Sequence, residues 1–209
     1  MIGKLVRSII AVLSMFLVLP ASAQDLPQGW EGDDIVYARI QTSMGDIDLA
    51  LNRTKAPVTV ENFFAYATKG YYDRTIFHRV VAGRLIQGGG YSRTLLERPT
   101  MDPIENEAAN GLDNERGTIA MARYTEPHSA TNQWYINLRH NEELDHEGEA
   151  LMLDWGYAVF GQVVAGMEVV DAIGMVETTA QGQFDEDVPA EPVIIERVDE
   201  IAAEEVGAE

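Results

Sequence analysis

Apolar and polar residues alternate along most of this chain, and the alternation predicts a mainly β protein. The runs Ile35–Ser43 and Ile47–Leu51 are apolar at every second position, which predicts a hairpin with one buried face. Further short segments with a strand-like pattern are residues 75–81, 84–88, 117–123, 132–137, 157–164 and 193–200. Many short strands with few helices indicate a closed or nearly closed antiparallel barrel.

Two segments have the period of an amphipathic helix instead. The first begins at Pro57, where the missing N–H costs nothing, and should stop before Gly70. Its apolar stripe consists of Val60, Phe63, Phe64 and Ala67. The second runs from Met167 to Met175, and its stripe consists of Val169, Ala172, Ile173 and Val176.

Residues 1–23 have the layout of a secretory signal peptide. Two basic residues precede an apolar run over residues 9–19, and the small residues 21–23 follow, so we expect cleavage before Gln24. The run is shorter than the roughly 20 apolar residues of a membrane-spanning helix, which argues against an uncleaved anchor. The pattern therefore predicts an exported protein that is soluble, and not held in a membrane, after cleavage.

The remaining chain has the composition of a single domain. It shows no internal repeat and no low-complexity linker. We expect a flexible leader over residues 24–34, one domain over residues 35–201, and a frayed acidic tail over residues 202–209. Cysteine is absent, so the sequence excludes disulfides and a thiol active site.

The charge balance limits the class of partner. The chain has 15 basic and 34 acidic residues, and cleavage would remove Lys4 and Arg7. The mature chain would then hold 13 basic residues against 34 acidic ones, a net charge of −21. This charge repels phosphate, which argues against nucleic acid and anionic lipid as partners.

The stretch of residues 77–91, FHRVVAGRLIQGGGY, carries the candidate chemistry. In a regular strand Phe77, Arg79 and Val81 share one face, so a cation lies among apolar neighbours. Gln87 follows on the next apolar segment, before the glycines at 88–90, whose backbone can approach a ligand closely. The stretch therefore predicts one wall of a peptide-binding site.

The same stretch resembles the signature of the cyclophilin-type peptidyl-prolyl cis-trans isomerases, in which FHR, two apolar residues, PGF and an apolar pair precede QGG. The likeness resumes later, at GTIAMA (117–122), QWYIN (133–137), LD (144–145) and YAVFG (157–161). The resemblance implies a closed eight-stranded antiparallel barrel capped by two α-helices. It further implies an enzyme without a cofactor that accelerates rotation about X–Pro bonds and assists the folding of exported proteins. Because the chain is similar to short bacterial members, we expect it in the periplasm.

The resemblance also implies roles for individual residues. Arg79 matches the catalytic arginine, which donates a hydrogen bond to the imide nitrogen, and Gln87 matches the glutamine that orients the peptide backbone. The expected walls of the proline pocket are Leu85, Ala122, Gln133, Tyr135, Leu144 and Tyr157. The expected partners are proline-containing polypeptides that are unfolded or partly folded, bound by a monomer.

Four residues depart from the family pattern at the substrate-binding pocket. Tyr135 replaces a phenylalanine and Tyr157 replaces a histidine, and both keep a ring, whereas the other two departures keep none. Arg84 stands where the family has the phenylalanine of PGF, and Glu143 replaces the aromatic residue at the pocket mouth that contacts cyclosporin. These two could pair across the rim, or each could contact a charged substrate flank. We expect weakened cyclosporin binding and reduced or narrowed activity. The alternative function is a non-catalytic proline-peptide-binding module or holdase with the same fold.

The segment after the barrel motifs leaves two questions open. HNEELDHEGE, at residues 140–149, could bind a metal ion, but its spacing matches no standard site, so we predict a solvated loop without metal. The apolar residues between His146 and Trp155 could cap the barrel or form an exposed patch for unfolded clients. The burial of Trp155 distinguishes the two outcomes.

Overall fold

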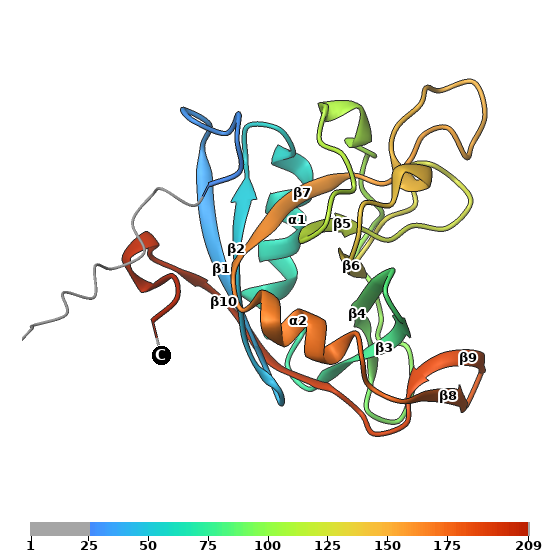
Figure 1. Cartoon of the computed structure of the whole chain (residues 1–209). Helices are drawn as coiled ribbons and strands as arrows, with labels where there is room; N and C mark the ends of the chain where they lie inside the picture. Colours follow the sequence, from blue (N-terminus) through green and yellow to red (C-terminus); the bar gives the residue numbers. More distant parts are fainter. Residues whose placement is uncertain (1–25, 209) are drawn as a thin grey trace, which may run out of the picture.

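The computed structural model describes residues 26–208, which form a closed antiparallel barrel of eight strands (Figure 1). The order around the barrel is β1, β10, β3, β4, β6, β5, β7 and β2. The bounds are β1 Ile35–Thr42, β2 Gly45–Asn52, β3 Thr75–Val81, β4 Leu85–Ser92, β5 Thr118–Met121, β6 Trp134–Asn137, β7 Val159–Ala165 and β10 Ile194–Ile201. Each predicted strand segment overlaps one of these strands, and the predicted fold class is confirmed.

Apolar side chains from the strands fill the barrel, and both helices add to the same core. Helix α1 spans Pro57–Ala67 and helix α2 spans Met167–Ile173. The buried cluster includes Ile40, Leu49, Phe63, Phe77, Trp134, Phe160, Val170 and Ile173. Burial of a large apolar side chain stabilises a fold by about 1.5–3 kcal/mol, so this cluster holds strands and helices together.

The predicted apolar face of α2 is only partly right. Val170 and Ile173 are buried, whereas Ala172, which the spacing placed on the buried stripe, is exposed. The helix also stops at Ile173 and not at Met175. A helix of two turns is positioned by the strand that it contacts, here β2, more than by its own spacing.

A second hairpin lies outside the barrel and was not predicted. Its strands are β8 (Thr178–Gln181) and β9 (Phe184–Pro189), and it lies beside β3 (Figure 1). The segment lacks a periodic apolar pattern, since most of its residues are polar and exposed. Short 3-10 helices complete the chain: η1 Ala108–Asn110, η2 Glu142–Leu144 and η3 Ala203–Glu205.

The two ends of the described chain contact the barrel. In the expected leader Trp30 is buried, and the Asp33 carboxylate accepts a hydrogen bond of 2.8 Å from Asn52 Nδ2. In the expected tail the backbone N–H of Gly207 donates to Asp48 Oδ2 at 2.7 Å. The predicted signal peptide lies outside the described residues. Across residues 26–208, no helix is both long and apolar enough to cross a membrane.

Candidate active site

A β-bulge at His78 sets the direction of Arg79. Phe77 pairs with Gly88 and Arg79 pairs with Gln87, so two steps along β3 match one step along β4. Phe77 therefore faces the barrel core, while Arg79 faces outward. The expectation that Phe77 and Arg79 share a face was wrong, because strict alternation cannot anticipate an inserted residue.

The sheet register then places the site residues in one row across neighbouring strands. Arg79 lies opposite Gln87, Gln87 lies opposite Tyr135, and Tyr135 lies opposite Ala120. Paired residues on adjacent strands have Cβ atoms about 4.5–5.5 Å apart on the same face. The barrel wall thus brings a cation, an amide and an aromatic ring side by side on its outer surface.

An apolar floor continues from this row. Leu85, Ala120, Tyr135 and Val159 form a buried cluster that is separate from the barrel core. The partly buried residues packed against this cluster include Ala122, Leu144 and Tyr157. The rings of Tyr135 and Tyr157 meet edge to face, 5.9 Å between centroids. The structure therefore brings together all the apolar residues that the resemblance placed in the proline pocket.

The two glutamines contact each other beside the arginine. Gln87 Nε2 donates a hydrogen bond of 3.0 Å to Gln133 Oε1. Together with Arg79 they line a hollow of about 170 Å³, whose other walls include His78, Tyr91, Tyr124 and Phe184. Glycine at position 90 leaves space for the Gln133 side chain, because a Cβ there would lie 2.5 Å from Gln133 Cγ.

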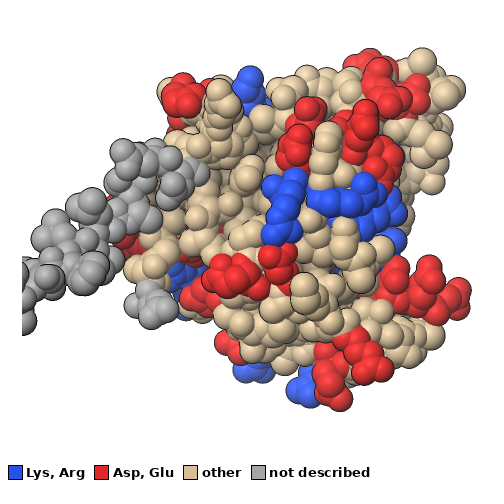
Figure 2. All heavy atoms as spheres, in the orientation of Figure 1, with Lys and Arg blue, Asp and Glu red and all other residues tan. Residues whose placement is uncertain are grey.

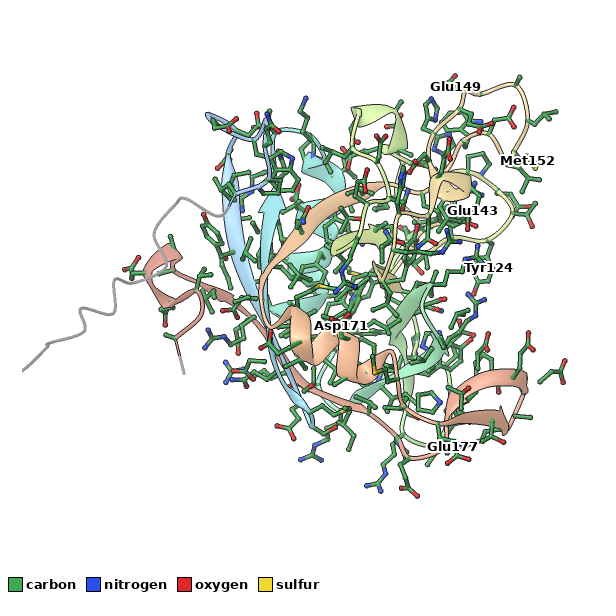
Figure 3. The ribbon with its side chains drawn as sticks, viewed as in Figure 1. Tyr124, Glu143, Glu149, Met152, Asp171 and Glu177 are labelled. Carbon is green, nitrogen blue, oxygen red and sulfur yellow. The ribbon has the colours of Figure 1, made fainter. Side chains whose placement is uncertain are left out.

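The two charged departures from the family pattern meet at the rim. Glu143 Oε1 lies 3.2 Å from Arg84 Nη2 and 2.8 Å from Arg139 Nη2. A hydrogen bond from its own backbone N–H and the charges of both arginines lower the pKa of the Glu143 carboxyl. Figure 2 shows basic side chains in a band across this face, with acidic side chains on both sides of the band. Figure 3, in the same orientation, labels Glu143 on this face. The rim is thus a charged cluster in which the arginines share one carboxylate.

A buried polar network supports the floor from below. Tyr135 Oη donates to Asn114 Oδ1 at 2.7 Å, and Asn137 Nδ2 donates to the same oxygen at 3.2 Å. Asn114 Nδ2 in turn donates to the carbonyl oxygen of Leu144 at 3.0 Å. Burial raises the pKa of the Tyr135 hydroxyl well above its ordinary value, so the group stays a neutral donor. No sequence pattern pointed to Asn114, because its role depends on contacts between distant segments.

His78 lies behind the arginine and is almost fully buried, with 2% of its surface exposed. Its ring packs against Tyr91, 4.5 Å between centroids, and Phe184, 5.8 Å away. Burial, and secondly the charge of Arg79, lower the pKa of His78 to about 4. The ring is therefore neutral at physiological pH and packs against these two aromatic side chains.

The long loop of residues 145–157 borders the apolar floor. Arg123 holds it in place: the guanidinium donates to the carbonyl oxygens of Met152, at 3.0 Å, and Gly156, at 2.8 Å, and lies over the Tyr157 ring. Trp155 is half-buried against the His128 ring, 4.8 Å between centroids. The apolar tip, Leu151–Leu153, is exposed and projects from the barrel, as Met152 shows in Figure 3.

The histidines of the acidic loop contact nearby polar groups, and His140 Nδ1 lies 3.7 Å from Glu115 Oε1. His140 Nε2 lies 3.2 Å from Asp145 Oδ2, and His146 Nδ1 lies 3.1 Å from the carbonyl oxygen of Trp155. Within residues 26–208, no group of three or more acidic or histidine side chains is placed to hold a metal ion.

The hairpin β8–β9 adds two site residues that sequence patterns missed. Phe184 lines the hollow beside Arg79, and Asp187 Oδ2 lies 3.6 Å from Arg79 Nε. Neither residue belongs to a motif, and their segment showed no strand periodicity. Their position becomes visible only once the hairpin packs against β3.

Comparison with known proteins agrees with this geometry. Residues 37–200 match the family described as cyclophilin type peptidyl-prolyl cis-trans isomerase/CLD. Peptidyl-prolyl cis-trans isomerase A of Dickeya dadantii is 44% identical over 193 residues, covering 92% of this chain and 95% of the relative. Peptidyl-prolyl cis-trans isomerase B of Escherichia coli is 52% identical over 157 residues, covering 75% and 94%.

Solved structures show the same fold at lower sequence identity. A cyclophilin type peptidyl-prolyl cis-trans isomerase of Cryptosporidium parvum superposes with a TM-score of 0.64 at 24% identity, covering 81% of this chain and 99% of that one. The family match spans most of the chain, and both bacterial relatives align over nearly their full length. The chain therefore belongs to the cyclophilin-type peptidyl-prolyl cis-trans isomerases.

Proposed function

We propose that this isomerase acts on exported proteins and assists their folding in the periplasm. The observation that carries its chemistry is the pairing of Arg79 with Gln87 across β3 and β4, at the edge of an apolar floor. A proline ring fits an apolar floor, and the adjacent amide and guanidinium suit the polar backbone on either side of the ring.

The chemistry requires only selective binding. Amide resonance gives peptide bonds a rotation barrier of about 18–20 kcal/mol, and uncatalysed X–Pro isomerisation takes tens to hundreds of seconds. A catalyst must bind the twisted amide more tightly than the planar one. Arg79 has the required property, because its guanidinium is always charged and only donates hydrogen bonds. It can donate to the imide nitrogen as the lone pair localises, while Gln87 holds the peptide backbone.

The family relation favours catalysis over the non-catalytic binding module or holdase. Arg84 and Glu143, the residues that suggested lost activity, contact each other at the rim. The apolar floor and the Arg79–Gln87 pair lie beside this cluster and contain neither residue. We propose that activity is retained and that the charged rim narrows the choice of substrate flank.

Two further features support a role with folding clients. Residues 1–23 have the pattern of an export signal. Leu151, Met152 and Leu153 are 66%, 54% and 81% exposed, on a loop that borders the site. Exposed apolar side chains in a row suit the apolar segments that an unfolded polypeptide presents next to its prolines. We propose that this tip holds such segments, and that one monomer suffices.

Exchange spectroscopy by NMR on an X–Pro peptide tests the catalytic proposal. The protein starting at Gln24 is compared with its Arg79→Ala variant. We expect cis/trans exchange to accelerate with the first and to be largely lost with the second. Shifted peptide resonances without acceleration would instead establish the binding module.

Export and clients need separate measurements. When the protein is expressed with its first 23 residues in a Gram-negative host, it should be recovered from the periplasm with Gln24 at its N-terminus. Mass spectrometry of the recovered protein measures this directly.

The double variant Leu151→Ser/Leu153→Ser tests the client-binding tip. It should slow the catalysed refolding of a protein whose folding is limited by proline isomerisation, and leave catalysis on a short peptide unchanged. If the variant and the wild type catalyse both reactions at equal rates, the tip is excluded as a client-binding element.

A further inference from the structure

The hairpin β8–β9 lies outside the barrel, yet it contacts the outer side of the site. Strand β9 lies along β3, the strand that carries Arg79 (Figure 1). Phe184, at the start of β9, packs its ring against Tyr91, 5.1 Å between centroids, and against the buried His78, 5.8 Å away. These aromatic contacts fix the hairpin to the site at one point.

The second contact is an ion pair with the arginine itself. Asp187 Oδ2 lies 3.6 Å from Arg79 Nε. Within residues 26–208, Asp187 is the one acidic residue whose carboxylate lies within 4.0 Å of this guanidinium. The Asp187 side chain is 24% exposed, whereas the neighbouring Asp185 and Glu186 are open to solvent. One acid of the three in this strand thus turns toward the site.

The backbone at Asp187 is unusual as well. Its φ is +65°, in the left-handed region, and among residues 26–208 only Arg74 and Leu95 share this property without being glycine. A side chain with a Cβ occupies this region at a cost, which is smaller for Asp than for most residues, and the contacts of the hairpin hold it there. Such positions occur preferentially at functional sites, and this one directs a carboxylate to the candidate donor.

We propose that Asp187 is a positioning residue for the isomerase reaction, which holds the guanidinium of Arg79 by its Nε edge. An arginine has five N–H donors in a planar fork, so an ion pair on its Nε side, here at 3.6 Å and longer than a hydrogen bond, favours one direction for the remaining donors. The Arg79 side chain is 41% exposed and lies on a long flexible stem, so without a partner it would sample several directions. The inference rests on the isomerase activity proposed above.

We infer that Asp187 acts by placing the Arg79 guanidinium and not by changing its electrostatic attraction for the substrate. A carboxylate beside the guanidinium weakens the attraction of that cation for an electron pair. Removing Asp187 would therefore accelerate catalysis if its negative charge were the dominant effect. It would slow catalysis if the placement of Arg79 matters more, which is our inference.

The test compares Asp187→Asn with the matched control Glu186→Gln, which removes the same charge from an exposed neighbour. Exchange spectroscopy on an X–Pro peptide gives kcat and KM for each. We expect Asp187→Asn to lower kcat by roughly three- to fivefold, the effect that a partly exposed ion pair can support. KM should stay within about twofold, and the Arg79 Nε–Hε resonance should shift in this variant and not in the control.

A second variant separates the carboxylate from the backbone. In Asp187→Gly the positive φ is relaxed, so an equal fall in kcat there would point to the missing carboxylate. An unchanged or raised kcat in Asp187→Asn, or an unmoved Arg79 Nε–Hε resonance, would overturn the inference. A wild-type protein without catalysis would instead refute the isomerase activity itself, so the turnover of the wild type separates these two failures.

Discussion

His78 should make the stability of this protein fall as the pH drops from neutral toward 4. The residue is 2% exposed, and burial lowers its pKa in the folded state to about 4, against an ordinary value of 6.5. Between these values the unfolded chain binds a proton that the folded chain does not. Stability therefore decreases as pH falls through this window and reaches its full loss below pH 4.

The size of the loss follows from the two pKa values. At 1.36 kcal/mol for each factor of ten in proton affinity, the complete loss is about 3 kcal/mol. At pH 5, where the unfolded histidine is mostly protonated and the folded one is mostly neutral, the loss is about 2 kcal/mol. A domain with a free energy of unfolding of about 5–15 kcal/mol would register this change clearly.

Urea unfolding at pH 7 and pH 5 measures this loss, with His78→Gln as the reference. The variant removes the titrating ring, so it reports the pH dependence of all other groups. We expect wild type to lose about 2 kcal/mol more than the variant between the two pH values. An NMR titration adds a direct measurement, in which His78 should titrate near 4. Exposed His140, whose pKa is raised by the hydrogen bond to Asp145, should titrate above 6.5 in the same spectra.

The reasoning would be refuted by a His78 ring that titrates near 6.5. It would also be refuted if wild type and His78→Gln lost equal stability between pH 7 and pH 5. Either result would mean that the ring is hydrated in the folded state, and that its packing against Tyr91 and Phe184 does not exclude water.

Other predictions concern the site. Because Arg79 stays protonated and His78 stays neutral, kcat/KM should be flat within about twofold from pH 6 to 8, and a bell-shaped profile would contradict a fixed cationic donor. Gly90→Ala places a Cβ 2.5 Å from Gln133 Cγ, so kcat/KM should fall severalfold while the urea midpoint changes little; an unchanged rate would show that the Gln133 position is unimportant. Glu143→Trp should give the pocket mouth an aromatic side chain and strengthen cyclosporin binding about tenfold, as measured by calorimetry. Equal affinities of variant and wild type would show that the residue at the pocket mouth does not weaken cyclosporin binding.

The barrel could be predicted from the sequence because its strands obey a local rule. One face of each strand is buried, so apolar residues recur with period two, and β1 and β3 were located almost to the residue. The hairpin β8–β9 escaped prediction because its residues are mostly exposed and polar. Packing against β3, and not an apolar period, decides that this segment forms strands.

The site could be predicted only in part. The resemblance supplied Arg79, Gln87 and the apolar residues of the floor, and the register places Arg79, Gln87 and Tyr135 in one row. The bulge at His78 puts Phe77 and Arg79 on opposite faces, although alternation predicted one face, because an inserted residue depends on the pairing with β4. Asp187 could not be found from sequence, because its contact with Arg79 joins residues far apart in the chain.

The two charged departures from the family pattern, Arg84 and Glu143, lie at the rim and not in the row that contains Arg79 and Gln87. Arg84 and Glu143 are 36% and 46% exposed, whereas the floor residues Leu85 and Tyr135 are 4% and 3% exposed. Exposed charges interact weakly with groups at a distance, because water and salt screen them. The carboxylate of Glu143 is also shared by two arginines, so little of its charge remains to act on Arg79. A substrate residue that reaches the rim would meet this cluster directly, while the proline itself would meet the apolar floor, where Tyr135 and Tyr157 keep aromatic rings. The substitutions should therefore alter which flanking residues and ligands bind, and leave the rotation of the X–Pro bond to Arg79.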